Sequence, residues 1–172
     1  MPELTFLSAV SMAEQIRQRK LSPVELVEAH LARIERLNPK LNAFVQVDAE
    51  GALRQARAAE VAVVRGEELG PLHGVPVSIK SSMGVEGMRC EAGTKLRAGF
   101  VATQDAPLVS RLRKAGAIIL GTTNTPANSL RPPPDHLPIG LISALAVNHA
   151  QSVGVGDDHV MERQSGEASA ER

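Results

Sequence analysis

The chain has 172 residues, 43% of them hydrophobic, which fits one domain with a core or a piece of a larger domain. With only three Phe and no Trp or Tyr, that core is expected to be aliphatic. Nineteen basic residues balance nineteen acidic ones, so no electrostatic footprint for nucleic acid or an anionic membrane is visible. With a single cysteine, Cys90, the chain can form neither an internal disulfide nor a CxxC metal site, which favours a reducing, cytoplasmic compartment. No apolar run is long enough for a membrane span.

Two helices are predicted at the start of the chain. The motif SMAE predicts a short helix that is capped by Ser11 and ends at about Lys20. The motif SPVE predicts a second helix that is capped by Ser22 and ends at Asn38-Pro39. The apolar residues of this second helix recur at steps of three and four, as on one helical face. They are Val24, Val27, Leu31 and Ile34.

A strand and a longer helix are expected next. Residues 41–47 are compatible with a short strand, and Asp48 can cap a helix that runs from about Ala49 to Arg65 and stops at Gly66. The apolar positions of this helix suit packing on a sheet. They are Leu53, Ala56, Val61 and Val64.

The stretch from Gly70 to Pro126 organises the rest of the chain. Within it, apolar residues at every second position, between Gly74 and Gly84, predict a short strand whose carboxyl end carries Lys80. The apolar positions are Val75, Val77 and Ile79. A cation is therefore expected where a strand ends and a loop begins.

A helix followed by a buried strand is predicted after this loop. Asp105 is the expected cap, and Gly116 ends the helix. The expected buried face consists of Leu108, Val109 and Leu112, and the cations that suit the last turns are Arg111, Arg113 and Lys114. Residues 117–120 are continuously apolar, which is typical of a strand buried on both faces. The succession of helix, glycine and buried strand indicates an α/β fold.

These motifs resemble those of the amidase signature family, whose members cleave or transfer amide nitrogen with a Ser, cis-Ser, Lys triad. The matching residues are GPLHGVPVSIK from Gly70, with Lys80 at the position of the family lysine, GAIILG from Gly116, and TNTP from Thr123. With the flanking helices, the likeness covers about residues 7–126. The resemblance implies an α/β fold, a mixed sheet flanked by helices, of which this chain holds the amino-terminal part with the opening helices and three strands.

The resemblance also implies a reaction. Family members hydrolyse carbon–nitrogen amide bonds of small-molecule substrates through an acyl-serine, without a metal or organic cofactor. The lysine takes a proton from the cis-serine, which relays it from the nucleophilic serine, so the resemblance assigns the catalytic role to Lys80. A lysine desolvated near a sheet can lose its charge and act as a base. By spacing alone, a lysine at a strand end is more often a solvated surface group than a catalytic one.

The last quarter of the chain differs in character. The run RPPP at 131–134 cannot continue regular structure, residues 137–147 are apolar but short, and residues 151–172 are polar with little to bury. We therefore expect a partial amidase domain over residues 1–126 and a divergent tail over 127–172, irregular and partly disordered.

The serines of the family triad have no counterpart in the sequence. A GGSSGGS-like run does not occur, and the nearest stretch, RQSGEAS at 163–169, lacks the glycine pair that close backbone approach requires. Family enzymes are also far longer. The sequence thus predicts a truncated amino-terminal part of an amide hydrolase that is inactive alone, and it does not define the substrate.

Other residues with chemical potential have simpler interpretations. His73 is expected to position a turn, Cys90 to be a small buried or half-exposed thiol, and Ser81 and Ser82 to shape the loop behind Lys80. The family often has aspartate directly after the lysine, where this chain has serine. A polar cluster in the tail is interpreted as solvated charge rather than as a metal site. It consists of His149, Asp157, Asp158 and His159.

Two other functions stay open. Within the same fold, the chain can belong to the component that releases ammonia from glutamine for a tRNA-dependent amidotransferase, which requires partner subunits. From a different class, it can be a non-catalytic fragment that associates with a partner, or with itself, through a sheet edge left open by missing strands.

Overall fold

The computed structural model describes residues 4–126, which form a small mixed sheet flanked by helices. The strands are β1 (Phe44–Val47), β2 (Pro76–Lys80) and β3 (Ile118–Thr123). Their order in the sheet is β1-β3-β2, with β1 antiparallel and β2 parallel to the central β3. The predicted α/β class and the three predicted strands are confirmed.

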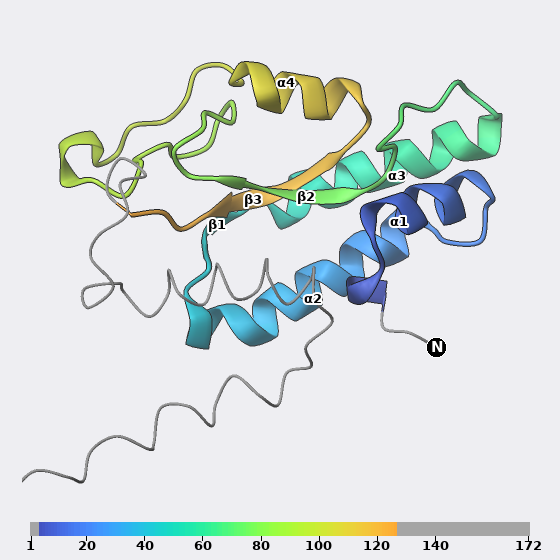
Figure 1. Cartoon of the computed structure of the whole chain (residues 1–172), viewed down its shortest axis with the longest axis horizontal. Coiled ribbons are helices and arrows are strands. Elements are labelled where there is room, and N and C mark those ends of the chain that lie inside the picture. Colours follow the sequence, from blue (N-terminus) through green and yellow to red (C-terminus); the bar gives the residue numbers. More distant parts are fainter. Residues whose placement is uncertain (1–3, 127–172) are drawn as a thin grey trace, which may run out of the picture.

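The helices lie on both faces of this sheet. They are α1 (Ala9–Arg17), α2 (Pro23–Leu41), α3 (Ala49–Arg65) and α4 (Pro107–Lys114), with 3-10 turns at Leu4–Phe6 and Lys95–Arg97. α2 and α3 cover one face, and α4 lies on the other (Figure 1). No helix in residues 4–126 is long and apolar enough to cross a membrane.

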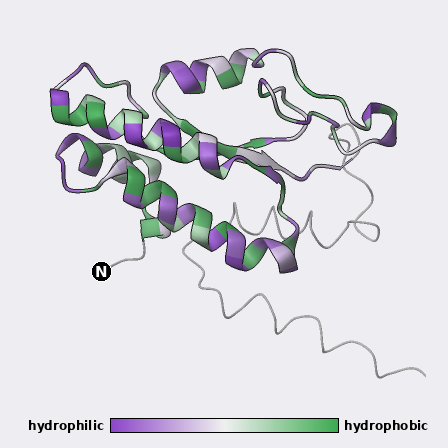
Figure 2. Ribbon diagram, turned by 180° about the vertical axis from the view of Figure 1, so that it is seen from behind, coloured by the Kyte–Doolittle hydropathy of each residue, from purple (hydrophilic) through white to green (hydrophobic). Residues whose placement is uncertain are grey.

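A separate apolar cluster packs against each face of the sheet. Beneath β3, Ile118 and Leu120 pack on small residues of α3 and on Val27 of α2. Above it, Ile119 packs with Ile79 of β2 and with residues of α4 and the loop before it. Hydrophilic and hydrophobic segments alternate along α2 and α3 (Figure 2), as expected for helices with one buried side. The buried strand that the sequence predicted is therefore confirmed, and it extends to Thr123.

The first helix begins earlier than predicted. Ser8, not Ser11, is the N-cap of α1, and its hydroxyl accepts the backbone N–H of Ser11 at 3.1 Å. The predicted cap was wrong because Ser11 already lies in the first turn, where its hydroxyl accepts a hydrogen bond from Gln15. The cap of α2 is as predicted, since the Ser22 hydroxyl accepts the backbone N–H of Val24 at 3.0 Å.

The predicted end of α2 at Asn38-Pro39 was wrong. The helix continues through Pro39 to Leu41 and ends at Asn42, whose φ of 48° is left-handed and whose N–H donates to the Asn38 carbonyl at 2.7 Å. A proline this close to the end removes one backbone donor without breaking the last turn. The strand that was expected over residues 41–47 consequently starts only at Phe44.

The third helix has the predicted bounds, and its predicted buried face is right at Ala56 and Leu53, which pack in the core, but not at the other two positions. Asp48 caps it by accepting the N–H of Gly51 at 2.9 Å, and Gly66 ends it with a φ of 69°. Val61 and Val64, however, are 45% and 69% exposed. The buried positions are Gly51, Ala52, Ala56, Ala59 and Val63. Most of these side chains are small, which lets the helix lie close to the sheet and to α2.

Two expectations for α4 were also wrong. Its N-cap is Ala106, whose side chain cannot accept a hydrogen bond. The carboxylate of Asp105, the predicted cap, instead accepts hydrogen bonds from Glu86 and Arg113. Leu108 is 48% exposed, whereas Val109 is fully buried and Leu112 packs against the same cluster. The predictions for residues 127–172, including the tail cluster and the RQSGEAS stretch, lie outside the described residues.

Candidate functional site

Lys80 is the last residue of β2, at the edge where β2 and β3 both end. Its register partner in the parallel pair is Thr123, the last residue of β3. The pairing continues one residue further, since the N–H of Ser81 donates to the Thr123 carbonyl at 2.9 Å. The backbone that carries Lys80 is therefore fixed on both sides of the residue.

The alternation of side chains along β2 sets the direction of Lys80. Ile79 is 2% exposed and packs under α4, whereas Ser78 faces the side of the sheet that α2 covers and lines a cavity there. Successive residues of a strand point to opposite faces, so Lys80 lies on the face of Ser78. Thr123, its partner in β3, lines the same cavity.

Lys80 differs from the other lysines in its exposure. The sequence has five lysines, all within residues 4–126, and four of them are exposed. Lys80 alone is half-buried, and among the described residues it forms no ion pair. Lys80 is thus the one lysine held partly out of water at the end of the sheet.

The loop after Lys80 returns to the same sheet edge. Ser81 is 5% exposed, and its carbonyl accepts the N–H of Ala92 at 3.2 Å. Gly93 follows with a φ of 66°, and a Cβ there would overlap the carbonyl oxygen of Thr125. Only glycine permits this approach. The backbone of Ser81 thus helps to hold the loop, and the expected role of the Ser81 and Ser82 side chains stays a prediction.

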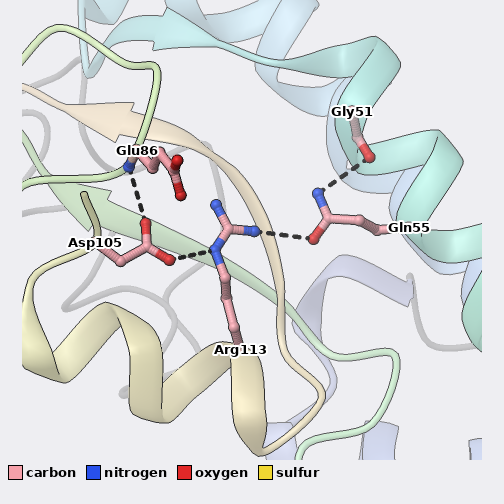
Figure 3. Close-up of polar contacts among 5 residues, drawn as sticks. All are labelled: Gly51, Gln55, Glu86, Asp105 and Arg113. Atoms are coloured by element: carbon pink, nitrogen blue, oxygen red, sulfur yellow. Dashed lines mark hydrogen bonds and ion pairs between the residues drawn. The ribbon is translucent and has the colours of Figure 1, made fainter. Parts of the chain in front are cut away.

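A chain of polar contacts anchors the far part of this loop (Figure 3). The Asp105 carboxylate accepts the N–H of Glu86 at 2.8 Å and the Nε–H of Arg113 at 2.8 Å. Arg113 also donates to the Gln55 side chain at 3.3 Å, and Gln55 donates to the Gly51 carbonyl. The loop, α4 and α3 are thereby connected. Sequence reasoning missed this function of Asp105, because no local spacing relates it to both of its partners.

One buried hydroxyl near Lys80 is not satisfied. Thr122 is completely buried, pairs in register with Ile79, and its Oγ1 has no hydrogen-bond partner among the described residues. A buried polar atom without a partner costs about 1–3 kcal/mol. No sequence signal identified this residue, which along the chain is only the link between a buried strand and the TNTP run.

A cavity of about 560 Å³ lies between the sheet and α2. Its walls are mostly apolar, and His30 and Arg33 of α2 contribute polar groups. The Nδ1–H of His30 donates to the Leu26 carbonyl at 2.8 Å. Desolvation by burial lowers the pKa of His30 below its ordinary value of 6.5, the bond to Leu26 opposes this shift, and the charge of Arg33 adds to it.

The remaining residues that the sequence singled out have structural roles. The Nε2 atom of His73 lies 2.9 Å from the Ala59 carbonyl, which ties the turn before β2 to α3, as expected of a turn-positioning histidine. Cys90 is a free, buried thiol, 4% exposed, as predicted. Within residues 4–126 no group of three or more His, Cys, Asp or Glu side chains is placed to hold a metal ion.

The comparisons with known proteins agree with this architecture. The chain is 47% identical over 124 residues to an indoleacetamide hydrolase of Bradyrhizobium diazoefficiens, covering 72% of this chain and 24% of the relative. It is 44% identical over 124 residues to a subunit of the glutamyl-tRNA(Gln) amidotransferase of Streptomyces coelicolor, covering 72% of this chain and 25% of the relative. The chain thus spans about a quarter of the length of these curated relatives.

A solved structure has the same fold over this part. The peptide amidase of Stenotrophomonas maltophilia superposes with a TM-score of 0.63 at 33% identity, over 69% of this chain and 24% of the amidase. The family model described as Amidase matches residues 25–136, which include the strand that ends in Lys80, the buried strand β3 and the loop between them. The chain therefore belongs to the amidase family.

Proposed function

We propose that Lys80 is the proton acceptor of an amide-hydrolysing site and that this chain supplies the lysine-bearing part of that site. The observation that carries the proposal is the environment of Lys80. It is the one lysine of the chain that is not exposed, it has no ion-pair partner within residues 4–126, and it stands on backbone fixed to β3. Membership of the amidase family supports this role.

The proposed chemistry needs groups that this sequence does not supply. A neutral Lys80 accepts a proton from one serine hydroxyl, which takes the proton of a second serine as that serine attacks the amide carbon. The negative charge on the carbonyl oxygen then needs backbone N–H donors. The sequence contains no GGSSGGS-like run, so we expect the 172-residue chain alone to be inactive. The serines would approach from the face of the sheet on which Lys80 lies.

A chimera tests the role of Lys80. Residues 7–126 replace the matching part of the Bradyrhizobium indoleacetamide hydrolase, which is 47% identical here, and hydrolysis of indoleacetamide is measured. We expect an active chimera in which Lys80→Met lowers kcat by about 10³-fold or more, because members of a catalytic triad act as a unit. The matched control is Lys114→Met, which removes an exposed lysine at the end of α4 and should leave kcat unchanged.

One result would contradict the role of Lys80, and another would contradict the expected inactivity of the chain alone. An active chimera that tolerates Lys80→Met removes the catalytic role of the lysine. Lys80-dependent amide hydrolysis by the 172-residue chain itself would show that serines of this chain, such as Ser81 or Ser82, complete the site.

A second candidate function within the same fold is supported by the similarity to the Streptomyces amidotransferase subunit. The chain is 44% identical to that subunit, nearly the same identity as its 47% to the hydrolase. In this alternative, the chain contributes to glutamine-dependent ammonia release and depends on partner subunits. Co-purification with other amidotransferase subunits from the source cell would support it, and their absence from a stoichiometric complex would argue against it.

A non-catalytic function through sheet edges is the third candidate. β1 and β2 each have a neighbour on one side only among the described residues, because β3 lies between them. Unpaired strand edges favour association with a partner or a second copy. Sedimentation that gives a monomer at all concentrations would rule out self-association. The single, buried, free Cys90 supports a cytoplasmic location, which we propose for the chain.

A further inference from the structure

A tight turn in the loop between β2 and α4 contacts the chain just after the ends of β2 and β3. The turn comprises residues 91–94, and the N–H of Thr94 donates to the Glu91 carbonyl at 3.1 Å. Both central residues are left-handed, with a φ of 52° at Ala92 and 66° at Gly93. This combination is typical of type I′ turns, in which an ordinary side chain at either central position is unfavourable. Ala92 therefore adopts a costly conformation that its surroundings must stabilise.

The first central residue of this turn is tied to the end of β2. Ala92 is 4% exposed, and its N–H donates at 3.2 Å to the carbonyl of Ser81, the residue directly after Lys80. The N–H of Ser81 in turn donates to the Thr123 carbonyl at 2.9 Å, which joins the ends of β2 and β3. A single hydrogen bond thus connects the turn to the residue that follows the lysine.

The second central residue packs against residues 124–126, which we call the β3 exit. A Cβ at Gly93 would overlap the carbonyl oxygen of Thr125, which is itself 4% exposed. At Gly87 and Gly99 of the same loop, where φ is 78° and 77°, an added Cβ would meet nothing within 4 Å. The requirement for glycine at position 93 therefore comes from a close tertiary contact as well as from the left-handed φ.

The β3 exit is also held by the residues before β1. The backbone N–H of Asn124 donates to the Ala43 carbonyl at 2.8 Å, and its side-chain N–H donates to the Asn42 carbonyl at 3.4 Å. The Oδ1 atom of Asn124 accepts the N–H of Thr125 at 2.8 Å. The β3 exit is thus fixed both to the turn and to the chain before β1, directly after the strand residue that pairs with Lys80.

We propose that Gly93 and Asn124 are positioning residues that together fix the β3 exit relative to Lys80. This positioning role rests on the proposed function of Lys80 as the proton acceptor. The two residues determine where the chain continues after β3, and so how the serine hydroxyls that the reaction needs align with the lysine. A displacement of about 1 Å, even when it originates far from the reacting bond, can lower the rate by about 100-fold.

The chimera with the Bradyrhizobium hydrolase tests this role, because the hydrolase sequence continues directly after Pro126. The kcat values for indoleacetamide and for the p-nitrophenyl ester of indoleacetic acid are measured on the same preparation. The nitrogen that leaves the amide must receive a proton, whereas p-nitrophenolate leaves without one, so a misaligned lysine slows the amide more than the ester. A merely structural defect lowers the fraction of folded enzyme, which reduces both rates equally and leaves their ratio unchanged.

Gly93→Asn is the main variant, since asparagine tolerates a left-handed φ but adds the Cβ that overlaps Thr125. We expect the amide-to-ester ratio of kcat values to fall about tenfold or more. The matched control is Gly87→Asn, which adds the same side chain at a left-handed position with free space and should leave the ratio unchanged. An unchanged ratio in Gly93→Asn would overturn the proposal.

Asn124→Ala loosens the β3 exit without adding an atom, and it decides the question if Gly93→Asn does not fold. We expect the ratio to fall about threefold or more, and an unchanged ratio would overturn the positioning role.

Lys80→Met in the same chimera separates the positioning role from the proposed function. If this variant keeps its amide hydrolysis, the lysine is not the proton acceptor, and the positioning role is overturned with it. If Lys80→Met lowers the ratio and neither Gly93→Asn nor Asn124→Ala does, only the positioning role is overturned.

Discussion

The two faces of the sheet are covered to different degrees. On the face of α4, Ile79 and Ile119 are 2% and 1% exposed, and the loop after Lys80 adds Val85 and Met88 to the same closed cluster. On the other face, the cavity remains between α2 and the sheet, lined by Ser78 and Thr123. Adjacent residues of β2 therefore have opposite functions: Ile79 anchors the strand on the closed face, and Lys80 is presented on the face that stays accessible.

The largest effect is expected from breaking the closed face. Ile79→Ala removes a buried side chain beneath α4 and should lower the free energy of unfolding by about 2–5 kcal/mol, because a cavity is left behind. Ser78→Ala, one residue away on the open face, should change it by less than about 0.5 kcal/mol. Urea unfolding followed by circular dichroism measures both, and similar losses for the two variants would contradict the difference between the faces.

The polar contacts of the closed face are expected to contribute less than its core. Asp105→Ala leaves the N–H of Glu86 and the Arg113 guanidinium without their acceptor, and we expect a loss of about 2 kcal/mol. Arg54→Ala is the control, since its ion pair with Glu50 joins side chains that are 68% and 92% exposed. Thermal unfolding should show a lower Tm for the first variant only, and equal Tm values for the two would show that Asp105 does not hold the loop.

On the open face, His30 makes stability depend on pH. Its pKa is lowered in the folded state, so the unfolded chain binds more protons below 6.5, and stability falls as the pH falls through and below that value. The slope contributed by His30 cannot exceed about 1.4 kcal/mol per pH unit. His30→Gln should flatten the curve of unfolding free energy between pH 7 and pH 5. An unchanged slope in this variant would assign the dependence to other groups.

The smallest effect, and the only gain, is expected at Thr122. Thr122→Val replaces a buried hydroxyl that has no partner in the described part of the chain, and should raise the free energy of unfolding by about 1 kcal/mol. Ser110→Ala on α4 serves as the control for loss of a hydroxyl. A loss of stability in Thr122→Val would mean that the hydroxyl has a partner, such as an ordered water, in solution.

Local signals predicted the elements well, and tertiary contacts decided the rest. Ser22, Asp48 and Gly66 mark helix ends by bonds within a few residues, and the structure has them there. Asp105 has the same local signal, yet its partners lie 19 and 8 residues away, so the expected cap does not form. The exposed Val64 shows the same limit, because apolar spacing does not reveal which helical face a sheet will cover.

The candidate site was predictable only in part. The alternating pattern before Lys80 predicted the end of a strand, and the family resemblance, not the spacing, gave the lysine a catalytic role. The cavity and the unsatisfied Thr122 had no signal in the sequence, since the cavity arises between the sheet and α2 and the burial of Thr122 arises from the pairing of β2 with β3. Such features depend on distances between elements, which no local pattern contains.

The strand order has a consequence for the order of folding. β3 is the last strand of the described part along the chain, and it is also the central one, so β1 and β2 have no common neighbour until it arrives. During synthesis, neither early strand can find its native pairing before Thr123 has left the ribosome. The helices, whose bonds are local, can form sooner, and the sheet assembles only after the last strand has appeared.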